Sequence, residues 1–468
     1  MLAILWVIGE QDRAVAETTR CFTQVVNLLE GIDLSVTEQR YALNVASLAA
    51  FEKKVGEHLY NEAVAIDRHL ARRKWSDKKT AQYAVHLLNR MKQQLEVLGG
   101  LPRAAFGENN TLPYRLAHYL LGHTVPYWNF TIGRHWEHRF MLDHWQNYKW
   151  ETCQQLYRMY GQEGCIREPL YSLARERLDM LRTNRLKTFS APSMSRGTDR
   201  VRLKLRPARI RRLLGRWWQG LKNADSAINP CMPSPWETSP VYKAVHFLAE
   251  IARKRFFDSV AFMRPPEERE FATYFLHTQP EYSVEGLAFE FRDQLALIQN
   301  IAALLPANIC LAVKEHWPML GIREIDFYRK LVETPNVVLI SDRINSYDLI
   351  RKSRTVFTLT GSTALEAIYE GVPAIVFGDV YFEGFEGIYK VDSIRKLKQV
   401  ILAVLANPKA GSSEESAVRA LAAMYAASYP GKISSEYSIE EMEDAENIKM
   451  VVDAIEKELS IWGIITPR

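Results

Sequence analysis

Cysteine is scarce in this 468-residue chain, and no two cysteines form a recognisable pair. The five that occur are scattered, odd in number and without a CxxC spacing: Cys21, Cys153, Cys165, Cys231 and Cys310. This distribution argues against a disulfide scaffold and against a zinc ribbon. Reduced, scattered thiols are typical of the cytosol, so the sequence predicts a cytoplasmic protein.

Long hydrophobic runs are also missing. No stretch reaches the roughly 20 apolar residues that a transmembrane helix needs. The start of the chain, residues 1–9, is apolar, but it lacks a basic n-region and is too short for a signal peptide. We expect it to form the first strand of an N-terminal domain.

Signatures of metal enzymes are absent as well, since the chain contains neither HExxH nor DxD. Residues 127–150 are rich in histidine and aromatic residues, and a helix would place His135 and His138 on one face. We interpret His135, His138 and His144 as partly buried, hydrogen-bonded histidines. A metal held by such a pair and a nearby carboxylate is the less favoured alternative, so we predict no metal site.

Acidic residues nearly disappear from residues 182–222, where Asp199 stands alone among many lysines and arginines. Basic residues beside Trp and Leu, as in residues 200–222, are typical of a segment that lies on an anionic membrane surface. A solvated basic arm fits the pattern equally well. Because no nucleic-acid-binding module accompanies the charge, we expect no nucleic acid partner, and an RNA-associated protein is a remaining alternative.

The length of the chain favours two domains. Residues 229–240 are rich in proline and mark the predicted boundary. We predict an N-terminal domain over residues 1–228, including the basic arm, a C-terminal domain over 241–440, and a final helix within 441–468. The N-terminal domain should be helix-rich, because helical periodicity covers residues 22–29, 41–55, 62–72 and 79–98.

Strand and helix patterns alternate between residues 271 and 378. The predicted strands are residues 272–277, 309–313, 337–340, 356–359 and 373–377. Helical patterns lie between them, at residues 288–304, 327–332, 347–352 and after Thr363. Short apolar runs without polar alternation are typical of strands buried on both faces of a parallel sheet. The segment therefore predicts an α/β domain.

Polar residues follow three of these strands: Gln279 and Glu281 the first, Lys314 to His316 the second, and Gly361 to Thr363 the fourth. Parallel sheets bind ligands at the carboxyl ends of their strands. Gly361 lets a ligand approach the backbone, and Ser362 or Thr363 is well placed to cap the next helix. A helix start of this kind presents amide groups to a phosphate, so we predict a crevice for an anionic ligand.

Four blocks in this order carry a resemblance to a known family: HTQPEYS (277–283), VKEHWPMLGIR (313–323), FYRKLVETPNVVLIS (327–341) and TLTGSTALEAIYEGVPAIVFG (358–378), followed by Tyr381. Together they resemble the capsule polysaccharide synthesis family. Its members are GT-B-type glycosyltransferases, and the best understood of them transfer Kdo from CMP-Kdo. The resemblance implies a GT-B-like fold of two Rossmann-like α/β domains with a central cleft.

The chain departs from the family at two positions. The family usually has His-Pro after Lys-Glu, whereas here Trp317 separates His316 from Pro318. Related Kdo transferases carry an aspartate soon after the glutamine of the first block, whereas this chain offers Glu281, then Ser283 and Glu285, so the general base is assigned by residue type.

The resemblance implies a nucleotide-sugar donor, CMP-linked and Kdo-like, and a glycan or glycolipid acceptor. Such an enzyme must bind the departing phosphate and deprotonate the acceptor hydroxyl. We expect Glu281 to be the general base and His316 to assist at the catalytic centre. The expected nucleotide- and phosphate-binding residues are Gln279, Lys314, Gly361, Ser362, Thr363 and Glu366. We expect no cofactor and no metal, because a monophosphate leaving group needs less charge neutralisation than a diphosphate.

The sequence thus predicts a metal-independent glycosyltransferase of surface or capsular polysaccharide biosynthesis, cytoplasmic, with peripheral attachment to the inner membrane face left open. One alternative is a UDP-sugar transferase or epimerase-like enzyme. Another is a non-catalytic GT-B-like binding or assembly protein, to which the Trp317 departure points.

Overall fold

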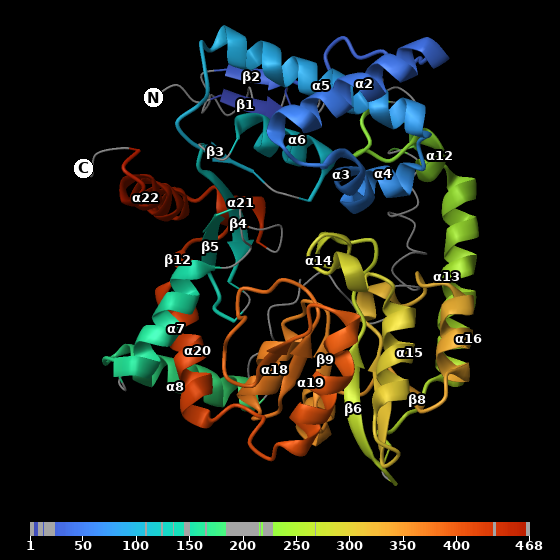
Figure 1. The fold of residues 1–468 in the computed structure, drawn as a ribbon, viewed down its shortest axis with the longest axis vertical. Helices are drawn as coiled ribbons and strands as arrows, with labels where there is room; N and C mark the ends of the chain where they lie inside the picture. The colour runs from blue at the N-terminus through green and yellow to red at the C-terminus, as the bar shows by residue number, and fades with distance from the viewer. Residues whose placement is uncertain are drawn as a thin grey trace. The chain divides into compact units, whose positions relative to one another are not determined.

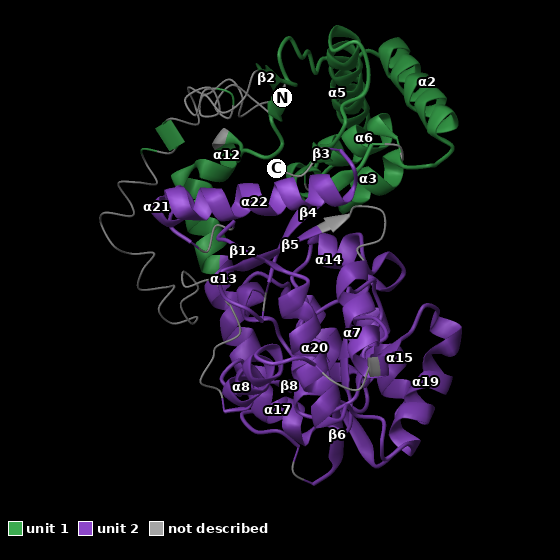
Figure 2. Ribbon diagram, turned by 90° about the vertical axis from the view of Figure 1, so that its left-hand side faces the viewer, with its two compact units in different colours: residues 1–127, 198–248 green, residues 128–197, 249–468 purple. Residues whose placement is uncertain are grey.

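The computed structural model describes residues 4–7, 13, 24–107, 110–122, 125–133, 135–144, 150–163, 166–183, 215, 217–218, 228–266, 268–433 and 437–464. The chain divides into two compact units, which Figure 2 colours separately. Unit 1 comprises residues 1–127 and 198–248, and unit 2 comprises residues 128–197 and 249–468. These units do not coincide with the ranges 1–228 and 241–440, because residues 128–183 pack with the large sheet of unit 2.

Unit 2 is built around a six-stranded sheet (Figure 1). Its strands, in spatial order, are β11 (Ile388–Lys390), β10 (Ala374–Val376), β9 (Val356–Thr358), β6 (Glu270–Phe275), β7 (Ile309–Lys314) and β8 (Val337–Ile340). All neighbouring strands are parallel. The predicted α/β class is confirmed, and each predicted strand between residues 271 and 378 is present.

Both faces of this sheet are buried, which explains the apolar runs without polar alternation. Ala272 and Tyr274 of β6 belong to the core on one face, whereas Phe271 and Phe275 belong to the core on the other. The first face is covered by α13 (Pro240–Val260), α15 (Gln294–Leu304), α16 (Ile325–Glu333) and α19 (Ile394–Ala406). The second is covered by α17 (Ser346–Lys352) and α18 (Thr363–Tyr369).

The order of strands reverses between β6 and β9. From β6 the chain proceeds through β7 and β8 to one edge of the sheet, then returns to β9 and proceeds through β10 and β11 to the other edge. The helices that follow β6 and β9 consequently cover opposite faces. Such a switch point leaves a crevice at the carboxyl ends of the two strands, which is where doubly wound sheets bind ligands.

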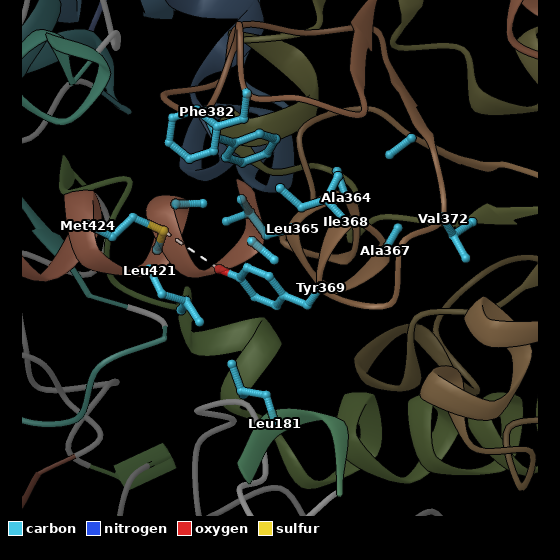
Figure 3. Close-up of a cluster of buried hydrophobic side chains, with 14 of the residues drawn as sticks. Leu181, Ala364, Leu365, Ala367, Ile368, Tyr369, Val372, Phe382, Leu421 and Met424 are labelled. Carbon is cyan, nitrogen blue, oxygen red and sulfur yellow. Dashed lines mark hydrogen bonds between the residues drawn. The ribbon is translucent and has the colours of Figure 1, made fainter. Parts of the chain in front are cut away.

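Three further helices pack behind α18 in unit 2: α7 (Glu151–Glu163), α8 (Leu170–Arg182) and α20 (Glu414–Ala426). Figure 3 shows Tyr369 of α18 with Leu181 of α8 and Met424 of α20, and the Tyr369 hydroxyl donates to Met424 Sδ at 3.7 Å. Arg182 Nε donates to the carbonyl of Tyr369 at 2.7 Å, and Trp136 Nε1 to that of Leu421 at 3.1 Å. These contacts make residues 128–183 part of the sheet's core.

Unit 2 also contains antiparallel strands that the sequence did not predict: β4 (Tyr127–Ile132), β5 (Arg139–His144) and β12 (Tyr429–Pro430). His135 and His138 lie in the turn between β4 and β5, so they do not share a helix face. The pairing of β4 with β5 supplies hydrogen bonds that local periodicity does not reveal. Past β12 come α21 (Ile439–Met442) and α22 (Ala445–Ile461), and α22 lies within the range 441–468 in which the final helix was predicted.

Unit 1 is helix-rich, as predicted. Its helices are α2 (Glu38–Val55), α3 (Tyr60–Ile66), α4 (Arg68–Arg73), α5 (Asp77–Val97), α6 (Leu112–Leu121) and α12 (Pro235–Thr238). Two strands, β1 (Ile4–Val7) and β2 (Gln24–Asn27), pair in parallel, and β3 (Ala105–Phe106) is a short third strand. The first strand is confirmed, but the helix predicted over residues 22–29 is wrong because β2 pairs with β1. The helix predicted over residues 62–72 is divided at Asp67, whose carboxylate caps α4.

Among the described residues, no helix is long and apolar enough to cross a membrane. Most of the basic segment 182–222, including the stretch 200–214, lies outside the described residues.

Candidate active site

The three polar segments predicted to meet do lie at one edge of the sheet of unit 2. Strand register places the end of β6 beside the end of β7, with Phe275 opposite Lys314, and beside β9, with Tyr274 opposite Phe357. Parallel strands end at the same edge, so the residues that follow β6, β7 and β9 share the crevice at the switch point.

His277 joins the loops after β6 and β9. Its Nε2 accepts a hydrogen bond from the backbone N–H of Thr360 at 3.3 Å and lies 3.3 Å from Thr358 Oγ1. An accepting Nε2 assigns the ring proton to Nδ1. The sequence placed His277 at a strand end but gave it no role, because only the fold brings it against Thr360.

Gly361 passes so close to His277 that a side chain does not fit. A Cβ at Gly361 would lie 2.6 Å from Thr358 Oγ1 and 3.1 Å from His277 Nε2. The first distance is shorter than a nonbonded contact allows, so the glycine is required by close approach.

The helix that follows Gly361 starts without the predicted side-chain cap. Ser362 is the N-cap residue of α18, but it has φ −60° and ψ −13° and its side chain makes no capping hydrogen bond. Thr358 Oγ1 instead accepts from the N–H of Gly361 at 3.2 Å. The capping prediction for Ser362 or Thr363 is therefore wrong: the hydroxyl that accepts an amide here comes from the end of β9.

A buried ion pair follows β7. Glu315 is 2% exposed and accepts from Arg323 Nε at 2.7 Å and from the Tyr328 hydroxyl at 2.7 Å. Arg323 Nη2 also donates to the carbonyl of His277 at 2.8 Å. Burial raises the pKa of Tyr328, which keeps its phenol a hydrogen-bond donor. Arg323 thereby fastens the loop after β7 to the loop after β6.

Lys314 is directed to the loop after β8. Its ammonium donates to the carbonyls of Ser341 at 2.6 Å and Ile344 at 2.8 Å. Burial lowers the pKa of Lys314 from 10.5 to about 8. The lysine predicted to contact phosphate thus serves first to hold a neighbouring loop.

His316 remains exposed at the crevice. Its Nδ1 lies 3.4 Å from Thr278 Oγ1, so the loops after β6 and β7 touch here as well. Trp317 begins a single 3₁₀ turn, η2 (Trp317–Met319), in which Pro318 is the second residue. The residue that departs from the family pattern is accommodated in this turn.

The remaining predicted residues differ in exposure. Glu281 is half-buried and precedes α14 (Tyr282–Glu285) without capping it. Gln279 donates through Nε2 to Glu285 Oε1 at 2.7 Å. Glu366 is only 5% exposed, in the first turn of α18.

The loop after β6 is also fastened to the ends of β9 and β10. Thr360 Oγ1 donates to the carbonyl of Ser283 at 3.1 Å, and the N–H of Asp379 donates to that of Leu287 at 2.8 Å. A Cβ at Gly378 would lie 2.7 Å from the same Leu287 carbonyl oxygen. Glycine at position 378 therefore permits this close approach of β10 to the loop.

The described residues contain no group of three or more metal-ligating side chains. His135 is 1% exposed and its ring packs edge-on against Tyr369 at 5.4 Å. The side chains of Asp143 and His144 lie outside the described residues.

Residues 242–399, which contain all three site segments, match the profile of a family described as capsule polysaccharide biosynthesis protein. This segment, about a third of the chain, is similar to the capsule polysaccharide biosynthesis family. The family predicted from the four sequence blocks is thereby confirmed, and the profile extends beyond residues 271–381 on both sides. No curated protein matches the chain.

The chain is also similar to several solved structures. One is the beta Kdo 2,7 transferase of Thermosulfurimonas dismutans KpsC, at 9% identity, with 97% of this chain and 100% of that chain covered and a TM-score of 0.43. Another is the beta Kdo 2,4 transferase of the same KpsC, at 13% identity, 68% and 78% coverage and a TM-score of 0.36. A third, the UDP-GlcNAc 2-epimerase from Neisseria meningitidis, has 12% identity, 90% and 98% coverage and a TM-score of 0.28. At these scores the likenesses carry no argument about activity.

Replacing Glu315 by glutamine should destabilise the protein strongly. The substitution leaves the guanidinium of Arg323, 6% exposed, without its buried countercharge, and we expect a loss of about 3 kcal/mol or more in the free energy of unfolding. Glu324→Gln is the matched control, because Glu324 is 71% exposed in its pair with Arg253 and should cost under about 1 kcal/mol. Equal costs in urea unfolding would contradict a structural role for the Glu315 pair.

The depressed pKa of Lys314 predicts a specific pH dependence. Between about pH 8 and pH 10.5 the unfolded chain binds the lysine proton and the folded chain does not, so this residue makes stability rise with pH. From pH 7.5 to pH 10 the parent should gain up to about 3 kcal/mol relative to Lys314→Met. Lys330→Met, at an exposed lysine, controls for general alkaline effects. A difference that stays constant with pH in urea titrations would overturn the assignment.

Proposed function

We propose that this protein is a glycosyltransferase that uses a nucleotide-activated sugar, CMP-linked and Kdo-like, in capsular or surface polysaccharide biosynthesis. One observation carries the proposal: within a segment of the capsule family, the loops bearing His277, His316 and Gly361 converge at the switch point of a parallel sheet. Doubly wound sheets bind nucleotides at this place. The acceptor is a glycan or glycolipid.

The donor phosphate is assigned to the loop Gly361–Thr363. Glycine at position 361 lets this loop pack closely against Thr358 and His277, and the amides at the start of α18 have no partner within the helix, so they are donors for the phosphate. His316, exposed on the neighbouring loop, supplies a further donor when its ring faces the phosphate. Lys314 contributes positive charge without direct contact to the phosphate, because its ammonium donates to the carbonyls of Ser341 and Ile344.

Glu281 is the proposed general base. It is half-buried, lies on the loop after β6 and makes no capping hydrogen bond, so its carboxylate is available to take the proton of the acceptor hydroxyl. The departing CMP takes the bond electrons, and its charge is met by the amides and His316. We propose that no metal takes part, since a monophosphate leaving group needs less neutralisation than a diphosphate.

A second candidate is a non-catalytic binding or assembly protein with the same crevice. The engagement of Lys314 in the loop after β8 favours it, because this lysine offers a ligand less charge than the sequence implied. Such a protein would bind a nucleotide or glycan and transfer nothing.

Nucleotide binding tests the proposed site. We expect CMP to raise the Tm, with UMP, GMP and RNA giving smaller effects, and the CMP shift to be lost in Gly361→Ala and reduced in His316→Ala. His58→Ala is the control for the histidine, because the His58 side chain is fully exposed in unit 1. Hydrolysis or transfer of CMP-Kdo by the parent distinguishes a transferase from a binding protein. A Tm unaffected by every nucleotide would contradict the transferase and favour a binding protein that recognises a glycan.

We also propose that residues 200–222 attach the protein to the inner face of the membrane. Support comes from the basic, tryptophan-containing sequence. Flotation with phosphatidylglycerol vesicles should recover the protein, whereas phosphatidylcholine vesicles or 0.5 M salt should not. Replacing Arg209, Arg211 and Arg212 by glutamate should abolish recovery without changing nucleotide binding. Equal recovery with both lipids would rule out electrostatic attachment.

A further inference from the structure

A small pocket in unit 2 lies beside the proposed phosphate site. Phosphate binding does not explain the carboxylate and the ordered glutamine side chains that line it. It measures about 310 Å³, and its lining includes Gln279, Glu285, Arg292, Gln294, Arg323 and Phe327. Its residues come from the loop after β6, from the start of α15 and from the segment leading into α16. Gln279 is two residues from His277, which contacts the phosphate loop.

A directed chain of hydrogen bonds forms one wall of the pocket. The backbone N–H of His277 donates to Gln294 Oε1 at 2.8 Å, which turns the Gln294 amide nitrogen toward Gln279 Oε1 at 3.1 Å. The Gln279 nitrogen is thereby turned toward Glu285 Oε1, at 2.7 Å. Because a backbone N–H can only donate, every amide in the chain has one permitted orientation. The chain ends on a carboxylate.

Glu285 presents an acceptor that the protein does not saturate. It is 9% exposed, and the hydrogen bonds among the described residues engage only Oε1. A buried carboxylate can accept about four hydrogen bonds, so Glu285 lacks donors on the side of the pocket. A ligand that offers an N–H there would be stabilised.

Two arginines present flat surfaces to the same pocket, and Arg292 supplies the donors, because Arg323 donates through Nε and Nη2 to Glu315 and to the carbonyl of His277. Arg292 lies over the ring of Phe289 at 4.4 Å, and Arg323 over the ring of Phe327 at 4.6 Å. Arginine stacked on an aromatic ring is well ordered and offers N–H groups at its edge. The lining also includes Asp293, whose carboxylate accepts from the N–H of Ala296 at 3.1 Å as the cap of α15. The pocket therefore combines the Glu285 acceptor with the guanidinium donors of Arg292.

We propose that this pocket binds the base of the nucleotide and that Glu285 selects cytosine over uracil. Cytosine carries an amino donor at C4 beside acceptors at N3 and O2, which matches the Glu285 carboxylate beside the Arg292 guanidinium. Uracil carries a carbonyl oxygen at C4, which would face the carboxylate oxygen and be repelled. The inference rests on the proposed function and adds the residue that makes a cytidine nucleotide the preferred donor.

The dissociation constants of CMP and UMP test this assignment. We expect the parent to bind CMP roughly ten-fold or more tightly than UMP. Glu285→Gln should reduce the preference to within about three-fold, because its amide can donate to the uracil C4 oxygen. Glu290→Gln is the matched control, since Glu290 is exposed in the neighbouring turn η1 (Phe289–Phe291) and does not line the pocket.

A modified nucleotide tests the same contact without altering the protein. The pyrimidin-2-one analogue of CMP lacks the C4 amino group, and the parent should bind it about as weakly as UMP. Equal binding of CMP and this analogue by the parent, or an unchanged CMP preference in folded Glu285→Gln, would overturn the role of Glu285 and leave the proposed transferase intact. Failure of the parent to bind any nucleotide would overturn both.

Discussion

Arg323 is the side chain on which the geometry of the crevice depends. It neutralises Glu315 in the interior of unit 2 and donates at the same time to the carbonyl of His277. His277 in turn accepts from the N–H of Thr360 at the end of β9. Three strand ends are thus joined by one line of contacts whose charged members are buried. A buried charge without its partner is costly, so the loops are held in one arrangement.

This arrangement divides the polar residues into those that build the crevice and those that remain for a ligand. Lys314, Glu315, Arg323 and Gln294 are used internally, each with its hydrogen bonds made by neighbouring loops. His316 and Glu281 are at least partly exposed. Under the proposed function, the positive potential at the phosphate comes mainly from backbone amides and one histidine. A preorganised set of dipoles of this kind needs no reorganisation during transfer.

Local sequence patterns predicted some strands of this protein correctly and missed others. The strand predicted at residues 337–340 matches β8, because this run is short, apolar and rich in β-branched residues. Residues 22–29 were predicted as a helix but contain β2, whose pairing partner is β1, about twenty residues away. Residues 135–138 form a turn because β4 pairs with β5. Both corrections concern strands, whose hydrogen bonds depend on a distant segment.

The sequence by itself determined the α/β class, through alternating strand and helix patterns, and the family resemblance, through four ordered blocks. The polar residues that follow the strands also determined the edge of the sheet where a ligand should bind. Periodicity and strand-end position are local properties, readable over a few residues. Only the tertiary structure decided the partner of each polar group: that Lys314 holds the loop after β8, that Thr358 and not Ser362 accepts the amide before α18, and that Gln279 orients Glu285. A hydrogen bond is chosen among all groups that folding brings within about 3 Å, and most of these are distant in sequence.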